Sequence, residues 1–456
     1  MNQSDHNQEV DKDISYSEPS GEKQGTGEVS SEEATAASMG NPDHKVSENR
    51  AAEEDSAEVK ITRWWDVQSL VVGLDGESKS QSEGIDNGQD QGQSYGRANV
   101  LSGAVSAEYE RKRAGEQIEE AGRLLAEGGV VAFPTETVYG LGADARNTAA
   151  VEAVFAAKGR PSDNPLIVHI ADMEQLDGLV TEVNETARRL MEAFWPGPLT
   201  LVLPVARGAV SPRVTAGLST VGVRMPAHDI ALRLIAAAGC PVAAPSANRS
   251  GRPSPTLASH VGEDLDGRID GIVDGGPTGV GLESTVAEVG RDGVVTVLRP
   301  GGITIEQLAR YTAGVRLDAA LQQAGSGTDI PAAPRAPGMK YAHYAPQGAM
   351  RIVSGAAPEA VAAKIQAELD AAAQRGEVTG VLAFDEHIDQ YRADLVLSLG
   401  SLAALETAAH RLYAALRRFD ARGVTYIMAE SCSEEGLGSA VMNRLLKAAG
   451  HQVIHV

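Results

Sequence analysis

A short apolar run meets a polar turn in the sequence Val130-Val-Ala-Phe-Pro-Thr-Glu-Thr-Val-Tyr-Gly-Leu-Gly142. The first four residues predict a short buried strand, which Pro134 ends because proline cannot donate a backbone hydrogen bond. Two hydroxyls, a carboxylate and a phenol follow at once. Outward from this stretch, segments of strand length alternate with segments of helical periodicity, which indicates an α/β fold.

The alternation divides the chain into two α/β domains joined by a linker. In the first domain, residues 59–321, we expect a mixed sheet with helices over about 113–127 and 149–158. Its strands are predicted at 60–67, 130–133, 166–170, 199–205, 221–225, 242–244, 271–273, 285–289 and 294–298.

In residues 349–456 strands alternate with long helices, which predicts a small, mostly parallel, Rossmann-like sheet. Its strands are expected at 351–353, 378–384, 394–397, 425–429 and 452–455, and its helices at 358–374, 402–421 and 439–449. The linker, residues 322–348, is rich in Gly, Pro and Ala but carries the aromatic run Met339-Lys-Tyr-Ala-His-Tyr344.

The negative charge is concentrated near the N-terminus. The chain has a formal charge of −22, and its first 100 residues hold 21 acidic and 8 basic side chains. Residues 1–58 have almost no large apolar side chains, so we expect a disordered acidic extension. Residues 76–107 are also polar and are predicted to be a flexible insertion. A chain this acidic is a poor stand-alone nucleic-acid binder, because phosphate binding depends on Lys and Arg.

The cysteine and hydropathy patterns predict a reduced, cytoplasmic protein. Two cysteines, Cys240 and Cys432, are too few for a disulfide framework and match no metal-ligand spacing. The sequence also contains neither an 18-residue apolar run nor a basic-then-apolar signal peptide. We therefore expect no membrane association.

Several common catalytic motifs are absent, including GxxxxGK[ST], GxGxxG after a strand, HExxH and CxxC, and Pro245-Ser-Ala-Asn248 lacks the GxSxG frame of a hydrolase. Instead, polar clusters follow the predicted strands of the first domain. Lys158 and Arg160 suit a polyphosphate, although both also fit simple capping of a helix C-terminus. Arg224 lies within an apolar strand and needs an anionic partner, either a buried carboxylate or a substrate. His169 taken alone is more typical of a hydrogen-bonded core histidine than of a ligand-binding one.

Further cations follow strands at Arg249, Arg252 and Arg299, and the segment Gly275–Thr285 is glycine-rich. Glycine lets backbone N–H groups approach an anion closely. Together the clusters predict a basic pocket for an anionic small molecule such as a nucleotide.

At these residues the sequence resembles the threonylcarbamoyl-adenylate synthases, in their long form with a YrdC-like domain and a C-terminal Sua-type domain. The resemblance rests on the motifs PTETVYGLG, KGRPSDNPLIVHI, FWPGPLTLVLP, VRMP, APSANRSGRPSPT, DGGPTGVGLESTV and LRPGG, in that order. APGMKYAHYAP resembles the family's interdomain linker, and GLGSAVMNRLLKAAG resembles a helix of its C-terminal domain. The match covers residues 60–67 and 113–456.

The resemblance implies an enzyme that converts L-threonine, bicarbonate and ATP into threonylcarbamoyl-AMP and pyrophosphate. A partner threonylcarbamoyl transferase complex would then modify tRNA, so that this chain needs no stable nucleic-acid contact of its own. Mg²⁺ would accompany ATP, held by phosphate oxygens and water rather than by a protein site. The chemistry would rely on positioning and charge stabilisation, not on a protein nucleophile.

The resemblance also assigns residues to each substrate. Lys158 and Arg160 would be the catalytic pair. L-threonine would be bound by Thr137, His169, Arg224, the backbone of Ala244, and Ser284. ATP would be bound by Lys158, Arg160, Asn164, Thr220, Ser246, Asn248, Ser254 and Arg299, with Tyr341, His343 and Tyr344 of the linker closing as a lid.

Two other functions are considered. An RNA-binding or ribosome-associated module would use a concave cationic face, but residues after 100 still carry a net negative charge and show no aromatic-plus-basic strand motif. A carbamoyl transferase acting on carbamoyl phosphate would not require the lid linker or the second domain.

Overall fold

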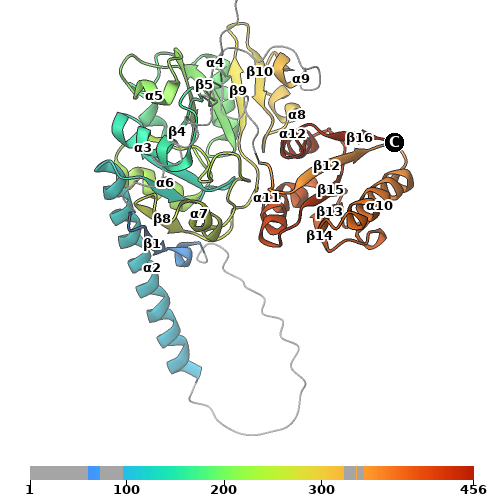
Figure 1. Ribbon diagram of the computed structural model, residues 1–456. Helices are drawn as coiled ribbons and strands as arrows, with labels where there is room; N and C mark the ends of the chain where they lie inside the picture. The colour runs from blue at the N-terminus through green and yellow to red at the C-terminus, as the bar shows by residue number, and fades with distance from the viewer. Residues whose placement is uncertain (1–59, 72–95, 323–334, 336–343) are drawn as a thin grey trace, which may run out of the picture. The chain divides into compact units, whose positions relative to one another are not determined.

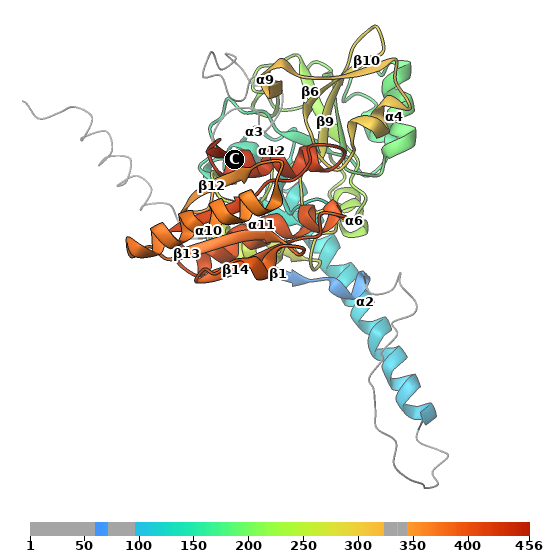
Figure 2. The same cartoon turned by 90° about the vertical axis from the view of Figure 1, so that its right-hand side faces the viewer.

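The computed structural model describes residues 60–71, 96–322, 335 and 344–456, with the backbone alone for residues 96–105. The predicted disordered extension and most of the linker lie outside the described residues. The described chain contains a sheet of eleven strands and a sheet of five strands (Figures 1 and 2). None of its helices is long and apolar enough to cross a membrane.

The larger sheet belongs to the first domain and has the order β1-β8-β2-β3-β7-β4-β6-β5-β9-β10-β11. It is mixed, as predicted, since β4 and β6 run parallel whereas β2 and β3 run antiparallel. Its strands are β1 (Arg63–Asp66), β2 (Val131–Phe133), β3 (Gly140–Asp144), β4 (Ile167–His169), β5 (Leu199–Pro204), β6 (Thr220–Arg224), β7 (Val242–Ala243), β8 (Gly271–Asp274), β9 (Thr285–Val289), β10 (Val294–Arg299) and β11 (Gly314–Leu317).

Helices cover both faces of the sheet near β2. Val131 and Phe133 pack in one apolar cluster with α2 and α6, whereas Ala132 packs in another with α3 and α7. This two-sided burial explains why β2 is apolar throughout rather than alternating. The helices of the first domain are α2 (Gly96–Ala126), α3 (Thr148–Lys158), α4 (Glu185–Phe194), α5 (Pro212–Thr215), α6 (Asp229–Ala238), α7 (Ala258–Leu265), α8 (Ile305–Ala309) and α9 (Ala319–Gln322), with 3₁₀ turns η1 (Gln68–Leu70) and η2 (Met173–Leu176).

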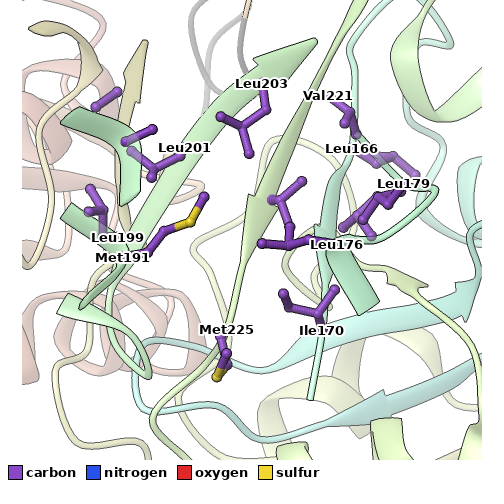
Figure 3. Close-up of a cluster of buried hydrophobic side chains, with 14 of the residues drawn as sticks. Leu166, Ile170, Leu176, Leu179, Met191, Leu199, Leu201, Leu203, Val221 and Met225 are labelled. Carbon is purple, nitrogen blue, oxygen red and sulfur yellow. The ribbon is translucent and has the colours of Figure 1, made fainter. Parts of the chain in front are cut away.

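The largest apolar cluster lies against β4, β5 and β6 (Figure 3). Leu199, Leu201 and Leu203 alternate along β5 and place their side chains in this cluster, as the period of two in a strand requires. Thr200, between them, points to the other face and contacts the hydroxyl of Ser284 at 2.8 Å. β5 therefore has one face in the core and one face toward the polar residues described below.

The sequence pattern did not predict β3. This strand begins at Gly140 and pairs antiparallel with β2 and β7. A Cβ atom at Gly142 would lie 2.8 Å from Val242 and 2.9 Å from Phe133. Only glycine fits this close approach. Strands are usually recognised by their β-branched residues, so a glycine at this position weakens the prediction of a strand.

The prediction of a flexible insertion over 76–107 is wrong for its last part. α2 starts at Gly96, well before the helix expected from Arg113. Residues 96–126 contain no proline and include several alanines, so the helix propagates backward from the turns that pack on the sheet. Residues 72–95 lie outside the described chain.

The second domain has a five-stranded sheet of order β14-β13-β15-β12-β16, in which every pair is parallel. Alternate residues of β13 face opposite clusters, one with α10 and the other with α11 and α12. The predicted doubly wound, Rossmann-like arrangement is confirmed. Its elements are β12 (Ala349–Ser354), α10 (Pro358–Gln374), β13 (Thr379–Phe384), η3 (Ile388–Gln390), β14 (Leu395–Gly400), α11 (Leu405–Ala421), β15 (Tyr426–Glu430), α12 (Gly438–Ala448) and β16 (Val453–His455).

One apolar cluster contains residues from both domains. Val138 and Leu282 of the first domain pack in the same cluster as Leu412 and Tyr413 of α11. Tyr344, at the end of the linker, joins them and stacks on Tyr413 with ring centroids 5.2 Å apart. The two domains therefore share a buried contact, and it reaches the polar residues of the site.

Candidate functional site

A pocket forms where the polar segments that follow the strands of the first domain meet. Its walls come from the β2–β3 turn, the end of α3, strands β4 and β6, the segment after β7, and the facing ends of β9 and β10. The lining residues are Thr135, Thr137, Val138, Gly140, Lys158, Arg160, Ile167, His169, Arg224, Ala244, Pro245, Ser246, Asn248, Ser250, Glu283, Ser284, Arg299 and Tyr344.

Lys158 is the last residue of α3. Asn147 caps the start of this helix, and Gly159 ends it in the left-handed conformation with φ of 61°. The ammonium group of Lys158 is buried and donates to the carbonyl oxygens of Ser246, at 2.5 Å, and Asn248. Burial, reinforced by the charge of Arg160, holds the pKa of Lys158 well below its ordinary value. A bound anion would favour the protonated form.

The segment after β7 is fixed by its own side chains. The Ser246 hydroxyl donates to the Asn248 amide oxygen at 2.5 Å. The Asn248 amide nitrogen donates to the carbonyls of Arg249, at 2.9 Å, and Arg252, at 2.8 Å. These bonds close residues 248–252 into a compact loop beside Lys158, and we call it the Asn248 loop.

Arg224 ends β6 and is buried. Its guanidinium group donates to the Thr137 hydroxyl at 2.9 Å and the Gly197 carbonyl at 3.2 Å, and it forms an ion pair with Glu136 at 2.5 Å. Of the two partners considered from the sequence, the buried carboxylate is therefore present, and it is Glu136. Thr137, the next residue, brings the same turn into contact with the pocket.

His169 lies directly beside Arg224, because β4 and β6 are parallel and pair these two residues in register. Burial, with the nearby charge of Arg224, lowers the pKa of His169 to about 3. The ring is therefore neutral at physiological pH. Its Nδ1 atom has no hydrogen-bonding partner among the described residues.

The ends of β9 and β10 form the opposite wall. Arg299 donates to the carbonyl oxygen of Ser284 from Nε at 3.1 Å and from Nη2 at 3.0 Å, and to its hydroxyl at 3.2 Å. Glu283 is buried, which acts to raise its pKa, but Arg444 and Arg299 together hold the pKa at about 2. The wall therefore carries an ionised carboxylate that is already paired.

The structure brings together most of the residues predicted for the site. Those that line the pocket are Thr137, Lys158, Arg160, His169, Arg224, Ala244, Ser246, Asn248, Ser284, Arg299 and Tyr344. Tyr341 and His343 lie outside the described residues. Asn164, Thr220 and Ser254 do not line the pocket.

Asn164 is fully buried, and neither side-chain polar atom has a partner among the described residues. Ser254 lies behind the wall, where its hydroxyl donates to Glu283 at 2.6 Å. Thr220 is the first residue of β6, at the opposite end of the strand from Arg224. Because a strand is extended, this places Thr220 roughly 13 Å from the Arg224 backbone.

Several lining residues were not predicted. Thr135 stands two residues before Thr137, so its side chain could have been expected on the same side of the turn. Glu283 was not predicted, because Tyr413 and Arg444, which bind it, lie far along the chain. Glu136 was likewise missed as the partner of Arg224.

The donor groups do not form a protein cage for Mg²⁺. Within the described residues, no group of three His, Cys, Asp or Glu side chains could hold a metal ion. The pocket carboxylate Glu283 accepts hydrogen bonds from Ser254, Tyr413 and Arg444, which occupy its oxygens.

Two family models match the chain. One, described as "Telomere recombination", matches residues 123–301, and the other, described as "Threonylcarbamoyl-AMP synthase, C-terminal domain", matches residues 303–450. The chain is 54% identical over 338 residues to the threonylcarbamoyl-AMP synthase of Bacillus subtilis, covering 74% of this chain and 94% of that protein. It is 48% identical over 347 residues to the enzyme of Pyrococcus abyssi, covering 75% and 98%.

A solved structure of Pyrococcus abyssi Sua5 complexed with L-threonine is also similar. It superposes with a TM-score of 0.70 and 47% identity, covering 75% of this chain and 96% of that one.

Proposed function

Because the chain belongs to the threonylcarbamoyl-AMP synthase family, we propose that its pocket condenses L-threonine, bicarbonate and ATP to threonylcarbamoyl-AMP and pyrophosphate. The observation that carries the proposal is the grouping of Lys158, Arg160, Arg224 and Arg299 around one pocket. ATP and bicarbonate are anions and threonine carries a carboxylate, and cations in a partly dehydrated pocket attract such groups more strongly than they do in water.

The threonine end of the pocket is formed by Thr137, His169, Arg224 and Ser284. Arg224 meets the substrate carboxylate with the guanidinium group that Thr137 and Glu136 hold in place. The neutral His169 ring offers a nitrogen without a partner among the described residues, which suits the threonine amine or hydroxyl. A neutral ring also avoids repelling the ammonium group of the amino acid.

The ATP end is formed by Lys158, Arg160, Ser246 and Asn248, with Arg299 on the facing wall. Lys158 supplies a point charge and Arg160 a planar fork, both suited to phosphate oxygens. The family resemblance assigns Asn164 to the same end, and its buried amide has no hydrogen-bonding partner among the described residues. Thr220 and Ser254 are assigned supporting roles behind the lining.

The chemistry needs placement rather than a protein nucleophile. Bicarbonate first carboxylates the threonine amine, and water is lost. A carbamate oxygen then attacks the α-phosphorus of ATP and pyrophosphate leaves. Lys158 and Arg160 stabilise the charge on the phosphate oxygens during this displacement.

The linker closes the pocket in this proposal. Tyr344 already lines it, with its ring buried against Tyr413. Tyr341 and His343 lie outside the described residues, and we propose on the family resemblance that they help to keep water from the carbamate and the mixed anhydride. Mg²⁺ enters with ATP, bound through phosphate oxygens and water.

The product is passed to a partner transferase that modifies tRNA, and this chain makes no stable contact with tRNA itself. Its acidic charge disfavours phosphate-backbone binding. We propose that the activity is cytoplasmic, because its product is used in the modification of tRNA. Salt-dependent tRNA binding with a micromolar or tighter Kd would contradict this division of labour.

The proposal is tested by measuring pyrophosphate release from purified protein with L-threonine, bicarbonate, ATP and Mg²⁺. Release of pyrophosphate is expected to require both threonine and ATP. It should fall sharply when serine or alanine replaces threonine. Equal release with those amino acids, or none with threonine, would overturn the proposal.

A further inference from the structure

Two buried arginines of the second domain bind carboxylates of the first domain. Arg444 of α12 pairs with Glu283 at 2.9 Å, and Arg417 of α11 pairs with Asp264 at 2.8 Å. Neither guanidinium group is more than 4% exposed. We call these contacts the Glu283 anchor and the Asp264 anchor.

The Glu283 anchor is joined to the wall of the pocket that carries Ser284 and Arg299. Arg444 donates to the carbonyl of Pro300 at 2.6 Å, next to Arg299, and its guanidinium carbon lies 5.9 Å from the centre of the Tyr344 ring. Arg444 therefore holds the end of β10, the start of β9 and the end of the linker together.

Tyr413 of α11 strengthens this anchor. Its hydroxyl lies 2.8 Å from one oxygen of Glu283 and 3.0 Å from the other. Burial and the charge of Glu283 hold the pKa of Tyr413 well above its ordinary value. The phenol is therefore a donor to Glu283 throughout the physiological pH range.

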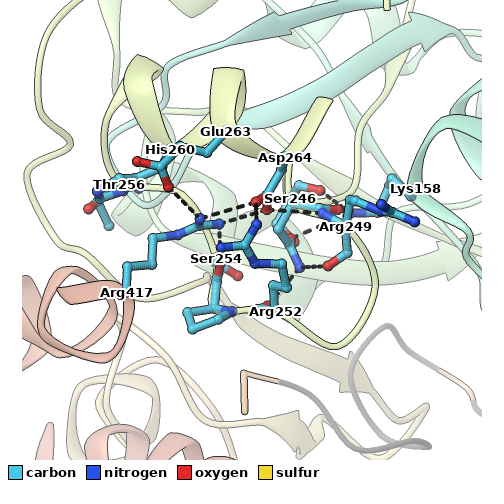
Figure 4. A network of polar contacts seen from close by, with 12 residues as sticks. Lys158, Ser246, Arg249, Arg252, Ser254, Thr256, His260, Glu263, Asp264 and Arg417 are labelled. Carbon is cyan, nitrogen blue, oxygen red and sulfur yellow. Dashed lines mark hydrogen bonds and ion pairs between the residues drawn. The ribbon is translucent and has the colours of Figure 1, made fainter. Parts of the chain in front are cut away.

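The Asp264 anchor is joined to a different part of the pocket, the Asn248 loop (Figure 4). Asp264 accepts from the backbone N–H of Arg249 at 3.1 Å and from the side chain of Arg252 at 2.5 Å. Arg417 also donates to the carbonyl of Pro253 at 2.6 Å. The loop beside Lys158 is thus held from behind by a side chain of the second domain.

Stability alone does not explain this arrangement. Apolar residues of similar volume often stabilise a buried contact as well as an ion pair does, because both charges must be dehydrated. In each anchor the carboxylate belongs to the first domain and binds an arginine of the second domain. The same carboxylate is also connected to a segment that forms part of the pocket. Such a connection can fix the position of the pocket segment.

We propose that Arg444 and Arg417 are positioning residues, through which the second domain sets the shape of two separate parts of the pocket. Arg444 positions the Ser284–Arg299 wall, which serves both threonine and ATP. Arg417 positions the Asn248 loop, which serves ATP alone. This inference rests on the proposed function, because it uses the division of the pocket between the two substrates.

The test compares Arg444→Lys and Arg417→Lys in the full-length protein, since each is the matched control of the other. Lysine keeps the charge but cannot hold two acceptors in the same planar geometry. Arg444→Lys is expected to raise the KM for threonine and for ATP by roughly tenfold each, the effect of losing about one charged hydrogen bond. Arg417→Lys is expected to raise only the KM for ATP.

His410→Ala is a control at the same interface. The exposed His410 ring contacts the Gly279 carbonyl at 2.9 Å, and neither residue lines the pocket. Both KM values should stay at the wild-type level. Tyr413→Phe provides a milder variant that keeps the ring but removes the donor to Glu283, so it reports on the Glu283 anchor if Arg444→Lys does not fold.

The outcomes separate the two proposals. Wild-type protein without threonine-dependent pyrophosphate release overturns the proposed function and the inference with it. Active wild-type protein whose folded Arg444 or Tyr413 variants keep both KM values unchanged overturns the inference alone. So does an Arg417 variant whose KM for threonine rises as much as its KM for ATP.

Discussion

The pocket and the Glu283 anchor both hold buried charges, yet the charges are paired differently. In the anchor, Glu283 accepts from Ser254, Tyr413 and Arg444, so carboxylate and guanidinium neutralise each other. In the pocket, Lys158 donates to carbonyl oxygens, and no carboxylate lies within ion-pair distance of it among the described residues. The anchor is complete by itself, whereas Lys158 in the pocket has charge available for a ligand.

This difference in the pairing of buried charges distinguishes a binding site from a structural contact within one molecule. Both regions are buried, and both contain arginine and hydroxyl groups. A buried group with unused hydrogen-bonding capacity costs stability unless a ligand completes it. Removing a charge of the anchor should therefore destabilise the protein, whereas removing the charge of Lys158 should mainly inactivate it.

The largest effect is expected at the anchor. Arg444→Met should lower the free energy of unfolding by about 3–5 kcal/mol, because Glu283 would remain buried without its main counter-charge. Urea unfolding monitored by circular dichroism measures the change. The double variant Arg444→Met, Glu283→Gln should recover much of the loss, and a single variant as stable as wild type would show that the anchor is not a coupled pair.

The next effect is expected at Lys158. Lys158→Met should reduce kcat by roughly 10²–10³-fold, the typical cost of removing one group that stabilises charge in the transition state. The unfolding free energy should change little, since no buried carboxylate loses its partner. Pyrophosphate release and thermal unfolding are measured together, with the surface variant Lys364→Met as control. Near-normal activity would remove Lys158 from the catalytic role.

Variants of Arg224 and Arg160 test the division of the pocket between threonine and ATP. Arg224→Ala should weaken threonine binding by roughly 10–100-fold and ATP binding much less, because a charged hydrogen bond to the substrate carboxylate is lost. Arg160→Ala should do the reverse. Separate calorimetric titrations with each ligand measure both constants. The same loss for both ligands in either variant would contradict the assigned roles.

The pH dependence of stability gives a separate test, at His169. Its pKa is about 3 in the folded protein and 6.5 ordinarily, so between these values the unfolded state binds the extra proton. The histidine therefore makes stability fall as pH falls from 6.5 toward 3. Urea midpoints at several pH values should show this slope, and His169→Asn should reduce it. An unchanged slope would mean that another group carries the acid sensitivity.

The sequence predicted the pocket cations well because they follow regular elements. Lys158 ends a helix, and Arg224 and Arg299 end strands, so the order of the elements places them at a common edge. The motif resemblance supplied the substrates. Local patterns were sufficient for this part of the site, since each residue's position depends mainly on its own element.

Contacts between distant segments could not be predicted in the same way. Glu283 is bound by Tyr413 and Arg444, which lie 130 and 161 residues further along the chain. No local pattern indicates such a pairing. β3 was missed for a different reason, because the glycines that allow its close packing also weaken the strand signal.

The most direct test of the account is to follow the carbon of bicarbonate into the product. Wild-type protein is incubated with L-threonine, ATP, Mg²⁺ and ¹³C-bicarbonate, and the nucleotide products are analysed by mass spectrometry. The account predicts threonylcarbamoyl-AMP that carries the label. Threonyl-AMP without the label, or AMP formed at the same rate without threonine, would contradict it.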